Sequence, residues 1–471
     1  MRVKFPRMLV YCGPAAALAM AAAVGLAGCR WLPTRPQLSV VLIVIDTLRA
    51  DHLGLYGYSR TTSPSLDQWG GKGVVFEQAH ASSPWTLPSF GSIYTGQLPS
   101  QHRAGMTISG DPADQTGRVV GEKRVFSGLD PGLPTLAEVL RDHGYETAAV
   151  VNNVYLHPMF GVARGFQDYD YVPGSEDDFR PASVVVDRAL AWVDAHGGTP
   201  FFLLIHLMDP HMNYNAPPPF RGRFTGAYKS AFSLPVHDTK AIRERAASMP
   251  QEDRMFITAA YDEEVAFADH HLGRLLEGFE QRHLLAHAVV VLTADHGEEL
   301  FDHNGFTHGH TMYEELLHVP LMVWAPGARP ARLSEPVELV DVDPTILQAV
   351  GLRPPTGLAG ISLWPAITRH TPLAPRPLYA ENTCIGPERK AIIQWPYKLV
   401  FTDDGSPLQL FDLTADAEER SEVNSAQPDV RRRLLAQLQH AFAPAEAAKL
   451  PEPVQLDVGT RERLRALGYL E

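Results

Sequence analysis

The stretch SVVLIVIDT, residues 39–47, joins an unbroken apolar run to a polar end. An apolar run this rich in β-branched residues is typical of a strand that is buried on both faces of a sheet. The carboxylate of Asp46 follows the run directly. Because ligands of α/β proteins bind at the carboxyl ends of parallel strands, this stretch predicts both the fold and one corner of a site.

Runs of the same kind recur along the chain, with helical patterns between them. The further predicted strands are residues 147–151, 201–207, 288–293 and 321–324. Apolar residues spaced three and four apart predict a long helix over residues 261–279, and another helix follows Leu133-Pro134-Thr135. This alternation of strands and helices predicts an α/β fold with a mostly parallel central sheet flanked by helices.

The pattern changes from about residue 376. Short segments typical of antiparallel strands occupy residues 389–394, 397–402 and 408–413, and a helix is predicted over residues 429–442. We therefore expect four parts: a signal peptide at 1–28, a tether at 29–37, a catalytic domain at 38–375, and a C-terminal α+β subdomain with a tail at 376–471.

Composition excludes several classes of protein. The chain has 471 residues, 41 Lys+Arg and 54 Asp+Glu, which gives a formal net charge of −13. We expect no nucleic-acid partner, because nucleic-acid binding needs a basic face. The 3 cysteines include no C-x-x-C pair, which excludes a cysteine zinc site or a disulfide scaffold.

The N-terminus has the pattern of an export signal. Arg2, Lys4 and Arg7 precede an apolar stretch that runs to Leu26-Ala27-Gly28-Cys29. Small residues before a cysteine resemble the bacterial lipobox, which implies cleavage before Cys29, its lipidation and a membrane partner through the lipid anchor. An uncleaved signal anchor is the alternative. In either case we expect the body in the cell envelope, at the periplasmic or extracellular face.

Polar residues of a possible site follow the predicted strands. Asp295 and His296 come directly after the strand at 288–293, as Asp46 comes after the first strand. Carboxylate and imidazole are ligand types for a divalent cation, although Asp46 alone could simply cap a turn. Thr86 precedes Pro88, which suits the first turn of a helix. Thr86 is therefore either an ordinary helix cap or a hydroxyl placed where a helix favours anions.

A resemblance to a known family rests on several motifs in order. The chain resembles the sulfatase family of the alkaline phosphatase superfamily, in the stretches VLIVIDTLRADHLGLYGY (41–58), SSPWTLPSFGSIYTG (82–96), HLMDPHMNY (206–214), TADHGEELFDH (293–303), HGHTMYEELLHVPL (308–321) and VDVDPTILQAVGL (340–352). The resemblance implies that Asp46, Thr86, Asp295 and His296 hold one divalent metal ion, manganese, zinc or calcium. It also places Thr86 at the position of the nucleophile.

The same resemblance suggests roles around the substrate. His211 matches a histidine that contacts the ester, and either His308 or His310 lies where the family places a group beside the leaving oxygen. Asn152 and Asn153 either bind the substrate or cap a turn. A second metal at Asp209, His211 and His310 is a further alternative. Glu298 and Glu299 either orient His296 or lie at the surface, and His206, inside an apolar strand, has the pattern of a core histidine.

The chain departs from the arylsulfatase pattern at the nucleophile. The family motif begins with the Cys or Ser that is oxidised to formylglycine, whereas this chain reads Thr86-Leu87-Pro88-Ser89-Phe90. We expect no formylglycine, because threonine cannot be converted to it. Thr47 also replaces a second aspartate, and Asn152-Asn153 replaces a Lys-x-His pair. These differences resemble the threonine-nucleophile branch, which uses manganese or zinc on phosphoesters.

We therefore expect a metal-dependent hydrolase of sulfate or phosphate esters, with Thr86 as nucleophile and a covalent intermediate. A second hypothesis is a phosphotransferase that acts on an envelope lipid or glycan. A third is a binding lipoprotein without catalysis. Composition and charge do not distinguish these three functions.

Overall fold

The computed structural model describes residues 37–111, 120–173, 179–446 and 453–466, and Leu38–Glu471 form one compact unit. The predicted signal peptide, the lipidation residue Cys29 and all but the last residue of the tether lie outside the described residues. Among the described helices, none combines the length and the apolar character needed to cross a bilayer.

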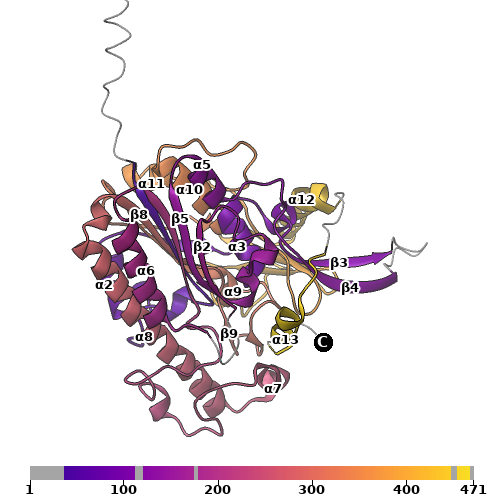
Figure 1. Ribbon diagram of the computed structural model, residues 1–471. Coiled ribbons are helices and arrows are strands. Elements are labelled where there is room, and N and C mark those ends of the chain that lie inside the picture. The colour runs from indigo at the N-terminus through magenta and orange to yellow at the C-terminus, as the bar shows by residue number, and fades with distance from the viewer. Residues whose placement is uncertain (1–36, 112–119, 174–178, 447–452, 467–471) are drawn as a thin grey trace, which may run out of the picture. The chain divides into compact units, whose positions relative to one another are not determined.

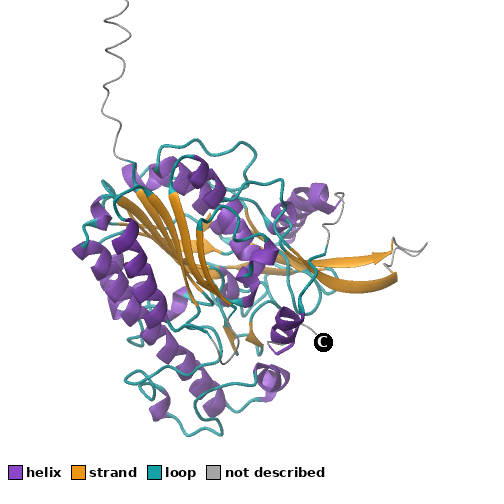
Figure 2. Ribbon diagram, viewed as in Figure 1, coloured by secondary structure: helices purple, strands orange, loops and turns teal. Residues whose placement is uncertain are grey.

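A central sheet runs through this unit (Figure 2). Its order is β12-β2-β11-β8-β1-β7-β5-β6, with β13 paired to β2. Neighbouring strands are parallel except for β11, which is antiparallel to β2 and β8. The strands are β1 (Ser39–Ile45), β2 (Val74–His80), β5 (Glu146–Asn152), β6 (Asp168–Val172), β7 (Phe201–Leu207), β8 (Ala288–Ala294), β11 (His318–Trp324), β12 (Ala331–Leu333) and β13 (Val337–Glu338).

Helices cover both faces of the sheet. In Figure 1, α2, α6 and α8 lie on one face, and α3, α5 and α10 lie on the other. The α-helices are α2 (Pro64–Gly70), α3 (Thr86–Thr95), α4 (Pro99–His102), α5 (Leu136–Asp142), α6 (Ala182–His196), α7 (Thr239–Arg245), α8 (Gln251–Gln281), α9 (Glu314–Leu317), α10 (Val342–Ala349), α11 (Trp364–Arg369), α12 (Pro428–Glu446) and α13 (Val458–Ala466). The predicted fold class, a mostly parallel sheet flanked by helices, is confirmed.

The strand β11 runs against its neighbours for a physical reason. A parallel return from β8 needs a crossover connection, usually a helix of several turns. Between Ala294 and His318 the only α-helix is α9, which has 4 residues, and the short strands β9 (Glu299–Leu300) and β10 (Phe306–Thr307) form a small ladder. The chain therefore reverses direction instead of crossing over.

The C-terminal segments form a second, antiparallel sheet. Its order is β14 (Leu378–Ala380), β15 (Arg389–Gln394), β16 (Tyr397–Thr402) and β17 (Gln409–Asp412), and α12 packs against β15 and β16. A separate hairpin of β3 (Gly105–Asp111) and β4 (Val120–Ser127) extends from the body in Figure 1. The predicted small C-terminal sheet and its helix are thus present, within the same compact unit as the central sheet.

A buried ion cluster joins this sheet to the rest of the unit. Lys398 on β16 is fully buried, and its Nζ lies 2.9 Å from Glu314 of α9 and 3.0 Å from Glu419. The two carboxylates hold the pKa of Lys398 above its usual value, although burial alone would lower it. The ammonium group therefore stays charged inside the fold, where only paired charges are tolerated.

Candidate active site

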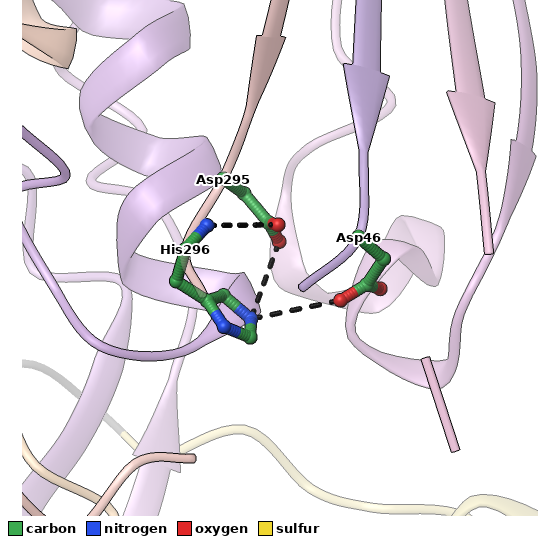
Figure 3. Close-up of side chains that lie close together, drawn as sticks. All are labelled: Asp46, Asp295 and His296. Atoms are coloured by element: carbon green, nitrogen blue, oxygen red, sulfur yellow. Dashed lines mark hydrogen bonds and ion pairs between the residues drawn. The ribbon is translucent and has the colours of Figure 1, made fainter. Parts of the chain in front are cut away.

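Two carboxylates meet at the carboxyl edge of the central sheet. The strands β1 and β8 are parallel neighbours whose register pairs Ile45 with Ala294, so Asp46 and Asp295 leave the sheet side by side. Asp46, Asp295 and His296 are each fully buried, and each offers a ligand atom within 4.8 Å of the others. Figure 3 shows the ring of His296 pointing toward both carboxylates.

A hydrogen bond to the adjacent backbone fixes the tautomer of His296. Its Nδ1 lies 2.9 Å from the carbonyl oxygen of Gly297, which can only accept, so Nδ1 carries the proton and Nε2 presents a lone pair. Position 297 requires glycine, because a Cβ there would collide with the carbonyl oxygen of Glu315. A hydrogen bond of this kind, made by the ring nitrogen that faces away from the ion, orients metal-ligating histidines in many proteins.

The cluster fits a divalent cation. His296 Nε2 lies 3.6 Å from Asp46 Oδ1 and 3.5 Å from Asp295 Oδ2, and both carboxylate oxygens are buried without a hydrogen-bond partner. Buried polar atoms are nearly always paired. Two unpaired carboxylate oxygens that face the lone pair of an imidazole therefore indicate a binding site for a cation. Two carboxylates and one imidazole are a suitable ligand set for manganese or zinc.

The protonation equilibria show the same lack of positive charge. Burial, and next the charge of Asp46, raises the pKa of Asp295 well above its usual value. Burial also lowers the pKa of His296 to about 3, which keeps the ring neutral. For Asp46, burial acts to raise the pKa, but the charge of His211 and the hydrogen bond with His206 bring it below the usual value.

Thr86 lies beside this cluster as the first residue of α3. Its side chain is buried, and Oγ1 is 3.3 Å from His296 Nε2. No side chain caps the N-terminus of α3, which leaves its first backbone N–H groups open to an anion. Ser89 fixes the helix against β8 by donating to the carbonyl oxygen of Asp295 at 2.6 Å. The structure thus brings together the four predicted metal-site residues: Asp46, Thr86, Asp295 and His296.

The two adjacent asparagines separate in space. Asn153 donates from Nδ2 to Asp46 Oδ2 at 2.6 Å, and the same atom is 3.3 Å from Thr86 Oγ1. Asn152 instead pairs with Arg180, accepting from its Nε and donating to its carbonyl oxygen, each at 3.1 Å. Only Asn153 reaches the site, while Asn152 has a structural role in place of the predicted contact with substrate.

Two histidines line the other side of the cluster. The ring centroid of His308 is 4.5 Å from that of His296 and 5.2 Å from that of His211. His308 Nδ1 is 2.9 Å from Glu298, and His310 Nε2 is 2.7 Å from Glu299. His308 therefore lies beside His296, and His211 lies beside His308, whereas His310 is held by a carboxylate of its own.

The acids Glu298 and Glu299 are almost fully buried. They bind His308 and His310, so neither lies at the surface or pairs with His296. Both glutamates therefore hold histidines of the site in place, Glu298 binding His308 and Glu299 binding His310.

Asp209 has a structural partner instead of a metal. It accepts the backbone N–H of Ala182 at 2.8 Å. Among the described residues, Asp46, Asp295 and His296 form the one group of histidine, cysteine and carboxylate ligands close enough for a metal. The alternative of a second metal at Asp209, His211 and His310 is therefore not supported, because their ligand atoms do not converge.

His206 is a site neighbour that the sequence pattern did not reveal. It is fully buried in β7, as a core histidine should be, but its Nε2 lies 3.4 Å from Asp46 Oδ2. The register of β1 and β7 pairs His206 with Val44. Only the order of the strands places His206 next to Asp46, and strand order cannot be read from periodicity.

A buried carboxylate–imidazole cluster next to a hydroxyl at a helix N-terminus is the arrangement expected of a metal-dependent hydrolase, here on an α/β fold. The family model "Sulfatase" matches residues 39–352, and the chain belongs to the sulfatase family, whose members are metal-dependent hydrolases of sulfuric or phosphoric esters. A second model, for the C-terminal part of N-sulphoglucosamine sulphohydrolase, matches residues 302–444. The resemblance found in the sequence is thereby confirmed.

Curated relatives and solved structures are similar over most of the chain. Arylsulfatase K of Bos taurus is 26% identical over 460 residues, covering 85% of this chain and 81% of the relative. The delta 4,5-hexuronate-2-O-sulfatase of Bacteroides thetaiotaomicron is 22% identical and covers 81% and 84%. The structure of a phosphonate monoester hydrolase from Silicibacter pomeroyi has a TM-score of 0.69 at 22% identity, covering 87% of this chain and 96% of that one.

Proposed function

We propose that this chain hydrolyses sulfate or phosphate esters through a covalent ester of Thr86, and that phosphate esters are its better substrates. The observation that carries the proposal is the position of Thr86 Oγ1, 3.3 Å from the unprotonated Nε2 of His296 at the open end of α3. A hydroxyl in that position faces both the cation ligands and the helix end that favours anions.

The residues of the chain have separate tasks in this reaction. Asp46, Asp295 and His296 would hold the divalent ion, which when bound lowers the pKa of the nucleophile and neutralises ester oxygens. Asn153 orients Thr86 by donating toward its Oγ1, and it holds Asp46 at the same time. Thr86 Oγ1 passes its proton to solvent water and attacks phosphorus or sulfur in line, and the bond to the leaving oxygen breaks.

The leaving oxygen needs a proton, and two imidazoles are in position to give one. His211 and His308 face each other beside the cluster. The Nδ1 of His211 lies 2.7 Å from the carbonyl oxygen of Met212, so this nitrogen donates and Nε2 is turned to the site side of the ring. We assign proton donation to the imidazolium form of His211, while His308 stays neutral beside it because burial, and next the charge of His211, lowers its pKa.

The second half of the reaction favours phosphate. Formylglycine has two hydroxyls, and the second can expel sulfate by elimination, whereas a threonine ester lacks that route. A water molecule must attack the Thr86 ester at phosphorus or sulfur, releasing the inorganic acid and restoring the hydroxyl. Direct attack of this kind is the ordinary course for phosphothreonine-type intermediates, and an acceptor alcohol in place of water would make the protein a phosphotransferase.

A substrate panel tests the proposal. Aryl sulfates, phosphate monoesters, phosphate diesters and phosphonates are offered to protein loaded with Mn²⁺, Zn²⁺ or Ca²⁺. We expect cleavage of a phosphorus ester to fall at least a thousandfold in Thr86→Ala and to survive in part in Thr86→Ser. Mass spectrometry of acid-quenched protein should find the phosphoryl group on the peptide that contains Thr86. Sulfate turnover that persists in Thr86→Ala would overturn the mechanism, and product formed only with added alcohol would favour transfer.

We also propose that the mature chain is anchored in the cell envelope through Cys29. The basic start, the apolar stretch and the sequence Leu26-Ala27-Gly28-Cys29 support this location. Labelling cells with an alkyne fatty acid should mark the wild-type protein and leave Cys29→Ala unmarked. Equal labelling of both proteins would contradict lipidation at Cys29.

A further inference from the structure

The proline-rich excursion over residues 214–250 carries a short helix, α7, that the proposed mechanism does not use. Thr239, its first residue, contacts the sulfur of Met212 through Oγ1 at 3.4 Å, and Met212 is the residue after His211. The helix also packs against β10, whose last residue precedes His308. Both histidine-bearing segments of the site therefore support α7.

One face of α7 is turned inward. Ile242 and Ala246 are buried, and Thr239 and Arg243 are half-buried, whereas Lys240, Glu244 and Arg245 are exposed. The spacing of the inward residues is three and four, as on one side of a helix. Arg243 lies one turn beyond Thr239, so its side chain shares the face that meets the site segments.

Arg243 has no counter-charge among the residues that the structure describes. No residue in the described parts of the chain forms a hydrogen bond or an ion pair with its guanidinium group. The two buried acids of the site segments, Glu298 and Glu299, are paired with His308 and His310. A half-buried guanidinium without a carboxylate is uncommon, because partial desolvation is offset only by a paired anion.

Arg243 lies on the face of α7 that packs against the histidine-bearing segments of the site. Thr239, one turn before it, contacts Met212 next to His211, and α7 packs against β10, which ends directly before His308. We place the leaving oxygen on the side of the cluster where His211 and His308 lie. The helix face that carries Arg243 is therefore turned toward the leaving group.

We propose that Arg243 is a specificity residue that pairs with a second anionic group, a carboxylate or a further ester anion, on the leaving group of the substrate. The proposal rests on the proposed function for the location of the leaving group. Arginine suits this task, since its planar fork binds a carboxylate or a phosphate with two parallel hydrogen bonds. The preferred substrates are then esters with at least two negative groups, one at the reacting centre and one on the alcohol side.

The experiment compares two esters that differ in one charge. These are 3-carboxyphenyl phosphate and 3-carbamoylphenyl phosphate, with the matching sulfates if the enzyme cleaves sulfates faster. For wild type we expect the lower KM with the carboxyl ester. Arg243→Gln should raise that KM about five- to tenfold, leave kcat unchanged and leave the KM of the carbamoyl ester within twofold. Arg243→Lys should restore part of the discrimination, and Arg245→Gln, on the exposed face of the same helix, is the matched control.

Binding is measured separately from turnover, by calorimetric titration of each ester into Thr86→Ala protein with and without the Arg243→Gln change. The carboxyl ester should lose five- to tenfold in affinity and the carbamoyl ester should not. An equal loss for both esters, or none for either, overturns the role of Arg243 even if Thr86 is the nucleophile. Persistent cleavage in Thr86→Ala with intact charge discrimination would instead overturn the nucleophile and leave Arg243 as a binding residue.

Discussion

Asn153 uses a single amide group to connect three parts of the site. Its oxygen accepts the backbone N–H of Tyr155 at 2.9 Å, which fixes the orientation of the amide and points Nδ2 at Asp46 and Thr86. The residue has a φ of +96°, a conformation that most side chains avoid. A backbone held in this way keeps the donor in place before substrate arrives.

Replacing each of the adjacent asparagines separates the two roles. We expect Asn153→Ala to lower kcat about 10- to 100-fold, because the nucleophile loses its positioning donor. Asn152→Ala, the matched control, should change kcat less than threefold but lower the free energy of unfolding by about 1–3 kcal/mol, since the buried Nε of Arg180 loses its acceptor. Steady-state kinetics and urea denaturation measure these effects. Equal losses of kcat in the two variants would contradict the assignment.

Asp343 on α10 makes stability depend on pH. Burial raises its pKa to about 8, whereas an unfolded aspartate titrates near 4. Between about pH 4 and pH 8 the folded protein keeps a proton that the unfolded chain releases, so this group's contribution to stability falls as the pH rises.

Asp343→Asn removes this dependence, because the amide is neutral throughout. Relative to wild type, its free energy of unfolding should increase by about 2–4 kcal/mol from pH 5 to pH 8, at about 1.4 kcal/mol per pH unit. Chemical denaturation at several pH values measures the difference. Asp142→Asn, on the exposed surface of α5, should show no such trend, and a flat difference for Asp343→Asn would show that the carboxyl is already ionised in the folded protein.

Sequence alone predicted single residues of the site unevenly. Asp46, Asp295 and His296 follow apolar runs directly, so strand ends revealed them, and Thr86 stood out through the ordered family motifs. The choice between Asn152 and Asn153 was open, because consecutive residues at a strand end point in different directions. The apolar neighbours of His206 hid its contact with Asp46.

Among the elements, periodicity predicted those that are buried on all sides. The predicted strands at 39–45 and 201–207 coincide with β1 and β7, and the helix over residues 261–279 lies within α8. The strand β2 was missed because polar residues such as Glu77 and Gln78 interrupt its apolar run. The antiparallel orientation of β11 could not be predicted either, because an apolar run does not show in which direction a strand runs. That orientation follows from the lack of a long crossover helix between β8 and β11.

The contact between β16 and α9 depends on one cation. Lys398→Met should lower the free energy of unfolding by about 3–5 kcal/mol, because Glu419 would remain buried and Glu314 partly buried without their shared ammonium partner. Lys72→Met is the matched control. The Nζ of Lys72 lies 3.4 Å from Glu280 and both side chains are exposed, so we expect the free energy of unfolding to fall by less than about 1 kcal/mol. Urea denaturation of both variants tests the difference. Similar losses in the two would mean that the cluster adds no stability.

At the scale of the whole molecule, the metal ligands join strands that are distant in sequence. Asp46 follows β1 and Asp295 follows β8, so an ion bound between them connects the two strands at the centre of the sheet. Only the folded chain offers this ligand set, and binding to the folded state alone increases stability.

Removal of metal should therefore lower the unfolding temperature. We expect EDTA to reduce Tm by several degrees and Mn²⁺ or Zn²⁺ to restore it, since a ligand at a hundred times its Kd adds about 2.7 kcal/mol. Asp295→Asn should be more stable than wild type in EDTA, because one of two crowded buried carboxylates is gone, and it should gain little from added metal. Scanning calorimetry measures both effects. A full response to metal in Asp295→Asn would place the ion elsewhere.

The order of the central sheet also interleaves the two halves of the chain. The strands β1, β2, β5, β6 and β7 precede the excursion at residues 214–250, and β8, β11, β12 and β13 follow it. A cut in that excursion would leave Asp46 and Thr86 on one fragment and Asp295 and His296 on the other. Neither fragment contains the whole sheet, so ester cleavage by the mixed fragments would require the pair of strands β8 and β11 to insert between β1 and β2. The two fragments could therefore serve in a complementation assay, in which ester cleavage reports that the central sheet has reassembled.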